Sequence, residues 1–145
     1  MAKTLYTAAA HVTGGRDKGF GRTDDGALEV DLRIPAALGG PGGGTNPEQL
    51  FAVGFASCFE SALGVVARRA KVEAGDAAVE SSVHLQSTGD GGFALAVALD
   101  VTLPSVTDPA QAAGLVEAAH KVCPYSNAVR GNIDVALTAN GRPVG

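Results

Sequence analysis

One continuous segment decides the fold of this chain: residues 45–71 read TNPEQLFAVGFASCFESALGVVARRAK. Its start carries the signals of a helix N-terminus, because Asn46 can cap the first turn, Pro47 suits the first helical position and Gln49 completes a capping box. Apolar residues then recur every three or four positions, and basic residues close the segment, as the helix dipole favours. We therefore predict a largely buried central helix of roughly 24 residues, about 36 Å long.

Short alternating segments flank this helix in the sequence. Before it, residues 5–12 and 27–34 are rich in β-forming residues, and the second alternates between apolar and charged positions. A short strand is expected between them at 20–23. After the helix, residues 78–87 and 93–103 alternate with period two around a glycine-rich turn, which predicts a hairpin of two long strands.

The remainder of the chain predicts a second helix and a last strand. Asp108 and Pro109 open an apolar stripe with helical spacing that ends near Cys123. Ser126 is expected to cap one further helical turn, and residues 133–138 alternate as a strand. Runs of strands interrupted by only two substantial helices predict an α+β fold, in which mainly antiparallel sheets pack on the long central helix and the second helix.

Length and composition narrow the class of protein. The 145 residues, 46% of them hydrophobic, suffice for a single domain over residues 1–145 but not for two independent cores. The formal net charge of -4 and the lack of a long basic run argue against nucleic acid and anionic membrane surfaces as partners. No signal peptide and no uninterrupted apolar run of about 18 residues is found, so we expect a cytoplasmic protein.

The two cysteines are the first candidates for chemistry, because structural disulfides are rare in a reducing cytoplasm. Cys58 lies midway along the apolar stripe of the long helix, where a small core side chain is an equally good explanation. Cys123 stands at the end of the second helix, where we expect partial exposure. It follows Cys58 by 65 residues, which excludes a local Cys-x-x-Cys loop and leaves only pairing through the fold.

Metal, nucleotide and histidine chemistry receive less support. The three histidines, His11, His84 and His120, show no zinc-binding spacing, so no metal site is predicted. The glycine-rich residues 39–44 lack the Gly-Lys-Ser/Thr of a phosphate loop. His120 can be imagined as the base of a Cys-His pair, but a basic residue at a helix C-terminus is the simpler interpretation.

Two charged residues complete a set with the cysteines. Arg16 lies in a glycine-flanked loop and Glu48 in the first turn of the long helix, and each alone is well explained as a solvated charge. Together with Cys58 and Cys123 they suit a thiol peroxidase. A nucleophilic thiolate needs a nearby cation, a second thiol traps the sulfenic acid that peroxide produces, and a carboxylate can hold an arginine in place.

Several motifs resemble the organic hydroperoxide resistance (Ohr) proteins of the OsmC/Ohr superfamily. The resemblance covers essentially the whole chain in the same order. It is carried by residues 14–17 (GGRD), 38–40 (LGG), 45–52 (TNPEQLFA), 58–59 (CF) with 62–63 (AL), and 122–133 (VCPYSNAVRGNI). It implies an intertwined homodimer with active sites at the subunit interface and no metal, flavin or heme. It also implies a peroxidase that prefers organic hydroperoxides and is recycled by a lipoyl-type dithiol, either dihydrolipoamide or a lipoylated protein.

The resemblance assigns a role to each candidate residue. Cys58 corresponds to the peroxidatic cysteine and Cys123 to the resolving one, while Arg16 matches an arginine on a mobile loop and Glu48 the carboxylate that orients it. An apolar pocket for an organic or fatty-acid hydroperoxide is expected from five aromatic residues: Phe20, Phe51, Phe55, Phe59 and Tyr125.

Some positions depart from the usual family pattern. The stretch 55–58 (FASC) and Glu60 vary around the nucleophile, where the family more often has tyrosine and an aliphatic residue, and Val129 replaces a usual threonine. Glu60 lies two residues from Cys58, so we expect it on another side of the helix, facing solvent or a subunit contact.

Two other functions remain open from the sequence. One is an OsmC-type peroxidase with a broader substrate range. The other is a non-catalytic redox sensor that uses the cysteine pair to switch a partner.

Overall fold

The computed structural model describes residues 2–145 and divides them into two compact units, the first ending at Leu50 and the second running from Phe51 to Gly145. The first unit contains a three-stranded antiparallel sheet in the order β1-β2-β3, in which Gly19 pairs with Leu32. Its elements are β1 (Ala10–Thr13), β2 (Gly19–Thr23), β3 (Glu29–Leu32) and the short 3-10 helix η1 (Ala36–Leu38). The predicted single domain over residues 1–145 stays a prediction.

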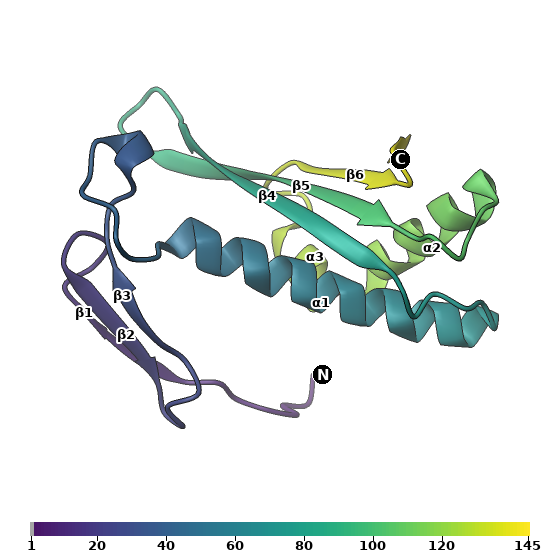
Figure 1. Ribbon diagram of the computed structural model, residues 1–145, viewed down its shortest axis with the longest axis horizontal. Helices are drawn as coiled ribbons and strands as arrows, with labels where there is room; N and C mark the ends of the chain where they lie inside the picture. The colour runs from purple at the N-terminus through teal and green to yellow at the C-terminus, as the bar shows by residue number, and fades with distance from the viewer. Residues whose placement is uncertain (1) are drawn as a thin grey trace. The chain divides into compact units, whose positions relative to one another are not determined.

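The second unit is built on a four-stranded sheet with the order β4-β5-β6-β7 (Figure 1). The long helix α1 (Pro47–Ala70) begins in the first unit and continues through the second. The other elements of the second unit are β4 (Ala78–Ser87), β5 (Phe93–Thr102), α2 (Pro109–Val122), α3 (Pro124–Val129), β6 (Val135–Ala139) and β7 (Arg142–Val144).

The α+β class is confirmed, and so are the long helix, the second helix and the β4-β5 hairpin. One detail of the sequence prediction was wrong, because the first strand begins at Ala10 rather than at residue 5. The strand β7 was not predicted. In addition, β6 pairs with β5 in parallel, because α2 and α3 carry the chain back along the sheet before the last pairing forms.

The start of α1 follows the predicted signals in part. The Asn46 side chain accepts a hydrogen bond from the backbone N–H of Gln49 at 2.9 Å, as an N-cap does. The reciprocal half of the capping box is absent among the described residues, because the Gln49 side chain instead accepts a bond from the Thr45 hydroxyl at 2.7 Å. The helix nevertheless begins where the sequence placed it.

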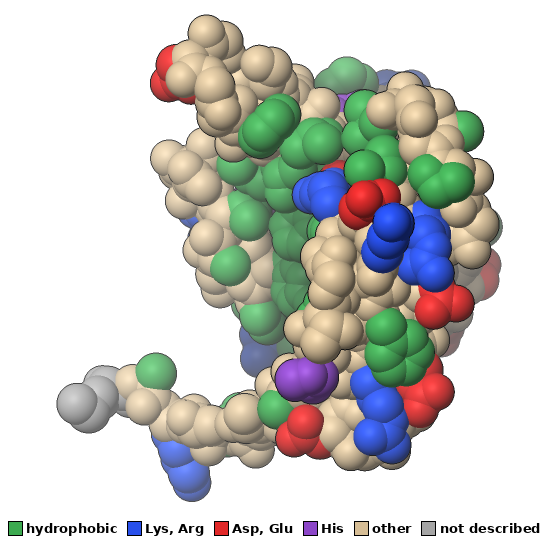
Figure 2. All heavy atoms as spheres, turned by 90° about the vertical axis from the view of Figure 1, so that its left-hand side faces the viewer, with side chains coloured by type: hydrophobic (Ala, Val, Ile, Leu, Met, Phe, Trp, Pro, Cys, Tyr) green, Lys and Arg blue, Asp and Glu red, His purple; other side chains and the backbone are tan. Residues whose placement is uncertain are grey.

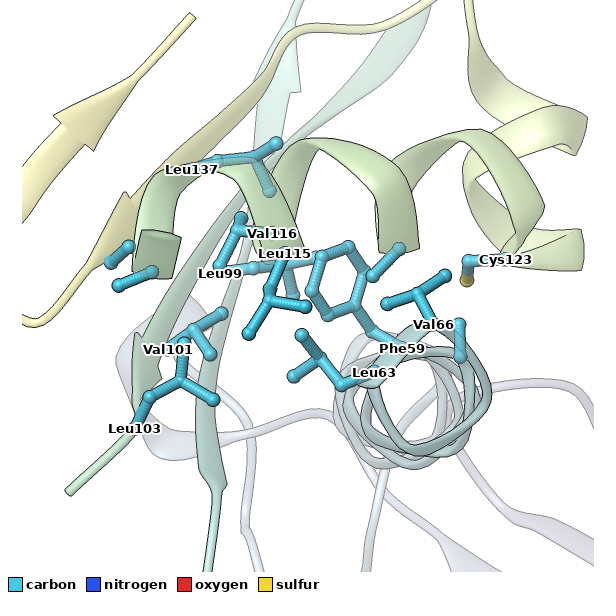
Figure 3. Close-up of a cluster of buried hydrophobic side chains, with 14 of the residues drawn as sticks. Phe59, Leu63, Val66, Leu99, Val101, Leu103, Leu115, Val116, Cys123 and Leu137 are labelled. Carbon is cyan, nitrogen blue, oxygen red and sulfur yellow. The ribbon is translucent and has the colours of Figure 1, made fainter. Parts of the chain in front are cut away.

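The core of the second unit lies between α1, α2 and β5. Phe59 and Leu63 project from α1 toward Val116 of α2 and Leu99 of β5 (Figure 3), and all four are almost fully buried. By length and composition alone α1 could also cross a membrane, yet 33% of its most apolar window is buried within the protein. One side of α1 is therefore a core face, and the other leaves apolar residues such as Val53 uncovered.

An extended arm precedes β1 in the first unit. Residues 2–9 form no strand, and Leu5 and Tyr6 are 89% and 81% exposed. Figure 2 shows the arm projecting from the strands of its own unit. The β-forming residues that predicted a strand here are thus in no strand of the described residues 2–145, although the Ala9 carbonyl oxygen accepts a hydrogen bond from the Asp24 backbone N–H at 3.0 Å.

Candidate active site

The first unit contains a bidentate ion pair. The Arg16 guanidinium donates to both carboxylate oxygens of Glu48, with Nη1 to Oε1 at 2.7 Å and Nη2 to Oε2 at 3.2 Å. The pair raises the pKa of Arg16, which stays charged. Arg16 sits in the β1-β2 loop, where Gly14 adopts a φ of +76° and leaves no room for a side chain, since a Cβ would lie 2.2 Å from the Lys18 carbonyl oxygen. The β1-β2 loop and the first turn of α1 thus hold the charged Arg16 guanidinium against Glu48.

The second unit brings both cysteines together. Cys58 lies in the middle of α1, partly buried, and Cys123 lies at the junction of α2 and α3. The Sγ atoms are 3.5 Å apart in the reduced state, and Figure 3 shows the Cys123 sulfur directed toward α1. A disulfide bond needs about 2.05 Å between the sulfurs, so only a small movement separates the two states.

The environment of Cys123 differs from the prediction. We expected a partly exposed residue at a helix end, but Cys123 is fully buried. The reason is α3, which starts at Pro124 and packs against α2, so that the cysteine between the two helices faces the core. A peroxide in solvent therefore has access to Cys58 rather than to Cys123.

Burial and the second thiol control the ionisation of Cys58. Burial raises the pKa of the Cys58 thiol, and the neighbouring Cys123 raises it further. The backbone N–H of Tyr125 donates to the sulfur and opposes this rise. Within the second unit Cys58 is therefore held mainly as the thiol at neutral pH, and a nearby cation is needed to form the nucleophilic thiolate.

Three of the predicted aromatic residues gather beside Cys58. The rings of Phe51, Phe55 and Tyr125 form a cluster with centroid distances of 5.7, 5.8 and 5.7 Å. Phe55 and Phe59 are fully buried, so they support this region from the core rather than offering open surface. Phe20 lies in the first unit on β2 and is 43% exposed.

A groove of about 710 Å³ runs along α1 past Cys58. Its lining includes Gly54, Ser57, Cys58, Val65, Arg69 and Tyr125. Sequence reasoning missed this surface, although positions 54, 58, 61, 65 and 69 follow the three-and-four spacing of one helix face. The signal was weak because Gly54, Ser61 and Arg69 on that face add nothing to the apolar stripe in which Cys58 lies.

Gly54 makes room for the Tyr125 ring, and its replacement tests that contact. A Cβ on Gly54 would lie 2.9 Å from the Tyr125 hydroxyl oxygen, whereas a Cβ on Gly114 of α2 would meet nothing within 4 Å. Both changes to alanine gain about 1 kcal/mol in helix propensity. Gly54→Ala also loses about 1–3 kcal/mol through overpacking. We expect thermal unfolding to give a higher Tm for Gly114→Ala than for the wild type, and a lower Tm for Gly54→Ala than for Gly114→Ala. Equal Tm values for Gly54→Ala and Gly114→Ala would show that the Tyr125 ring moves aside without a loss of stability.

The remaining sequence candidates take structural positions. His120 Nδ1 lies 2.9 Å from the Ser126 hydroxyl oxygen, and burial together with Arg130 lowers the pKa of His120. His120 thus bonds to a serine rather than to a cysteine. Ser126 was predicted to cap the helical turn that is α3. This prediction was wrong, because Ser126 lies buried inside α3. Glu60 is exposed, as expected, and Val129 packs partly buried against the core.

Residues 2–145 contain no group of three or more His, Cys, Asp or Glu side chains placed to hold a metal ion. The reactive groups described above are the thiols of Cys58 and Cys123 and the ion-paired guanidinium of Arg16. The absence of a metal or cofactor from the working protein stays a prediction.

Comparison with protein families first defines the class. The model of the OsmC-like protein family matches residues 40–138, a segment that includes both cysteines and all of α1, α2 and α3. The chain therefore belongs to the OsmC-like family.

Individual relatives define the branch within it. An organic hydroperoxide resistance protein of Xanthomonas axonopodis pv. citri is 50% identical over 138 residues, which cover 94% of this chain and 95% of the relative. A crystal structure of a putative organic hydroperoxide resistance protein from Vibrio cholerae, with captopril bound in one of the active sites, superposes with a TM-score of 0.92. It is 48% identical, and the match covers 98% of this chain and 96% of the other. The crystal structure of the organic hydroperoxide resistance protein OhrB of Bacillus subtilis superposes with a TM-score of 0.83. It is 46% identical, and the match covers 92% of this chain and 98% of the other. These matches confirm the resemblance read from the sequence, and the branch is that of organic hydroperoxide resistance.

Proposed function

We propose that the protein is a thiol-dependent peroxidase that reduces organic hydroperoxides to alcohols. One observation carries the proposal: the Sγ atoms of Cys58 and Cys123 lie 3.5 Å apart beside a groove that gives Cys58 access to ligands. A partly buried thiol next to a fully buried second thiol suits reaction with peroxide at the first and disulfide formation with the second.

The reaction uses the two thiols in sequence. The Cys58 thiolate attacks the distal peroxide oxygen, the O–O bond breaks, and the leaving alkoxide takes up a proton to become the alcohol. Cys58 is then a sulfenic acid. The Cys123 sulfur attacks the Cys58 sulfur, a disulfide forms, and the hydroxyl group leaves as water. A lipoyl-type dithiol, from dihydrolipoamide or a lipoylated protein, restores both thiols by two exchanges and becomes a disulfide itself.

Arg16 and Glu48 are proposed to complete the catalytic set. The charged guanidinium stabilises the Cys58 thiolate and the departing oxygen, and Glu48 holds the guanidinium through the bidentate pair. Two features support these roles: the pair is well formed, and burial leaves Cys58 in need of a cation.

Replacing Arg16 with glutamine is expected to slow Cys58 oxidation at neutral pH. Burial raises the Cys58 pKa, so losing the cation moves it higher still, and each unit of upward shift lowers the thiolate fraction at pH 7 about tenfold. The rate of Cys58 oxidation should therefore reach half of its maximum at a higher pH in Arg16→Gln than in the wild type. Stopped-flow oxidation by cumene hydroperoxide across pH measures this. Arg22→Gln is the matched control, because Arg22 forms an ion pair with Glu29 at 2.9 Å in the same sheet. An unchanged pH profile in Arg16→Gln would remove Arg16 from the mechanism.

The substrate class follows from the surroundings of Cys58. Phe51, Phe55 and Tyr125 give an apolar environment, with Phe20 and Phe59 proposed as further contributors. Each buried methylene of an organic hydroperoxide contributes about 0.8 kcal/mol, which hydrogen peroxide cannot provide.

Steady-state consumption of cumene hydroperoxide and hydrogen peroxide with dihydrolipoamide tests the proposal. Preference for the organic substrate supports it. Equal turnover of both indicates an OsmC-type peroxidase of broader range, and stoichiometric oxidation without turnover indicates a redox sensor.

We further propose a cytoplasmic homodimer that needs no metal or cofactor and has neither nucleic acid nor a membrane as partner. Two features support association with a second copy: the exposed arm with Leu5 and Tyr6, and the outer edge of the ten-residue strand β4, which pairs with no other strand among residues 2–145. Light scattering coupled to size-exclusion chromatography measures the mass in solution, and a monomer would contradict this part of the proposal.

A further inference from the structure

We propose that His120 is a positioning residue for disulfide formation. Through its hydrogen bond to Ser126 it fixes the junction of α2 and α3, from which the Cys123 sulfur reaches Cys58. The inference rests on the proposed peroxidase function and concerns its second step. In that step the Cys123 sulfur bonds to the Cys58 sulfur, the S–O bond of the sulfenic acid breaks, and the Cys123 proton leaves with the hydroxyl group as water.

The first argument is the place of Cys123 in the chain. Cys123 lies between α2 and α3 and has an extended backbone, with φ -63° and ψ 122°. The angle between the two helices therefore directs its side chain. The α3 helix has only 6 residues, and isolated helices shorter than about 12 residues are marginal in water. The orientation of α3, and with it the direction of the Cys123 thiol, depends on the contacts that attach α3 to α2.

The second argument is that His120 attaches α3 to α2 at two points. Its Nδ1 lies 2.9 Å from the Ser126 hydroxyl oxygen, and its backbone carbonyl oxygen accepts a hydrogen bond from the Arg130 guanidinium. Ser126 is fully buried, and within residues 2–145 its hydroxyl has no hydrogen-bond partner other than His120. Burial and Arg130 lower the pKa of His120, so the ring is neutral at pH 7 and Nδ1 can accept from the hydroxyl.

The third argument is how closely this junction must be placed. The Cys123 Sγ lies 3.5 Å from the Cys58 Sγ and has to approach by about 1.5 Å to form a disulfide. A misplacement of about 1 Å in a reacting group can slow a reaction step about a hundredfold. Without the His120–Ser126 hydrogen bond, α3 is free to shift relative to α2, and Cys123 shifts with it.

A role in stability alone is the alternative explanation of the same bond. A variant that removes only the His120 ring leaves a buried hydroxyl without a partner, which destabilises the fold wherever Cys123 points. Ser126→Ala avoids this effect because it removes the hydroxyl itself, and the half-buried His120 ring retains access to water. Ser126→Ala therefore breaks the bond at the smallest cost in stability.

The experiment follows one turnover of the reduced protein mixed with one equivalent of cumene hydroperoxide. Rapid quenching and mass spectrometry separate the sulfenic acid, which adds one oxygen, from the disulfide, which has lost two hydrogens. We expect conversion of the sulfenic acid into the disulfide to slow roughly ten- to hundredfold in Ser126→Ala and in His120→Leu. Formation of the sulfenic acid should change less, because it does not use the Cys123 sulfur.

Two further variants separate positioning from stability. His120→Asn should restore much of the rate of disulfide formation, because the asparagine amide oxygen can accept from the Ser126 hydroxyl. Ala112→Gly is the stability control, since it lowers helix propensity at a position about 12 Å along α2 from His120. It should lower the Tm and leave the rate of disulfide formation at the wild-type value. The double variant His120→Leu/Ser126→Ala should be no slower than the slower single variant, because both changes remove one bond.

The outcomes distinguish this inference from the function on which it rests. A folded Ser126→Ala variant that forms the disulfide at the wild-type rate overturns the role of His120 and leaves the peroxidase standing. The same conclusion follows if Ala112→Gly slows disulfide formation as much as Ser126→Ala does. A wild type that forms no disulfide with the hydroperoxide overturns the proposed reaction itself, and the assignment of His120 with it.

Discussion

Cys58→Ser is expected to abolish turnover of cumene hydroperoxide, with a loss of at least about a thousandfold in kcat/KM. The thiolate is the attacking nucleophile, and a serine hydroxyl is a weak nucleophile unless an adjacent base activates it. In the described residues 2–145 the hydrogen-bond partners of the Cys58 side chain are the Cys123 thiol and the Tyr125 backbone N–H, and neither is such a base. The measurement is peroxide consumption with dihydrolipoamide in excess. Cys58 lies beside the groove and is only partly buried, so the exchange of sulfur for oxygen leaves the core packing in place.

A thiol count makes the result specific to Cys58. One equivalent of hydroperoxide should remove both free thiols per chain in the wild type and none in Cys58→Ser, whose remaining thiol is the buried Cys123. Far-UV circular dichroism and the Tm of the variant report whether the fold is retained. If a folded Cys58→Ser variant consumed peroxide at the wild-type rate, the peroxidatic role would pass to another group.

The parts of the fold that local signals specify were predictable from the sequence. Asn46 and Pro47 mark the start of α1, and the apolar residues after them repeat at helical spacing through four further turns. The β4-β5 hairpin likewise follows from two alternating strands around a glycine-rich turn. In each case residues close in the chain decide the structure, so the sequence pattern contains the needed information.

Features that depend on distant segments were not predictable in the same way. The parallel pairing of β6 with β5 requires the path of α2 and α3, and Cys123 is buried only because α3 turns back against α2. Residues 5–9 have the composition of a strand but form none in the described part of the chain, residues 2–145, although the Ala9 carbonyl oxygen accepts a hydrogen bond from the Asp24 backbone N–H. Whether a segment forms a strand, or a residue is buried, depends on a segment that is distant in the sequence, and the local pattern does not identify that segment.

The candidate site likewise has features that the sequence predicted and features that only the tertiary structure reveals. The importance of Cys58 and Cys123 was inferred from chemistry and from a family resemblance, and their 3.5 Å separation is a result of tertiary structure. The pairing of Arg16 with Glu48 likewise spans 32 residues. Arg69 was taken only as a helix-terminal charge, and its place among the residues lining the groove beside Cys58 is a result of the structure.

Removing the second thiol is expected to leave an enzyme that reacts once and then fails. Without Cys123 the Cys58 sulfenic acid has no thiol to trap it, so further peroxide converts it to the sulfinic and sulfonic acids, which a dithiol does not reduce. A serine at this fully buried position would leave its hydroxyl without a partner at a cost of about 1–3 kcal/mol, so Cys123→Ala is the better variant. In the absence of reductant it should consume hydroperoxide in a first phase as fast as the wild type.

Mass spectrometry and steady-state kinetics then distinguish the two roles. With dithiol present, turnover of Cys123→Ala should fall as peroxide accumulates, and the intact mass should gain two or three oxygen atoms located at Cys58. The wild type under the same conditions should show only the loss of two hydrogens that marks a disulfide. Sustained turnover of Cys123→Ala without over-oxidation would mean that the external dithiol reduces the sulfenic acid directly, and that the buried thiol 3.5 Å from Cys58 is not the resolving group. The two cysteines therefore make separable predictions: loss of Cys58 removes the first phase of peroxide consumption, and loss of Cys123 removes the protection of Cys58 that follows it.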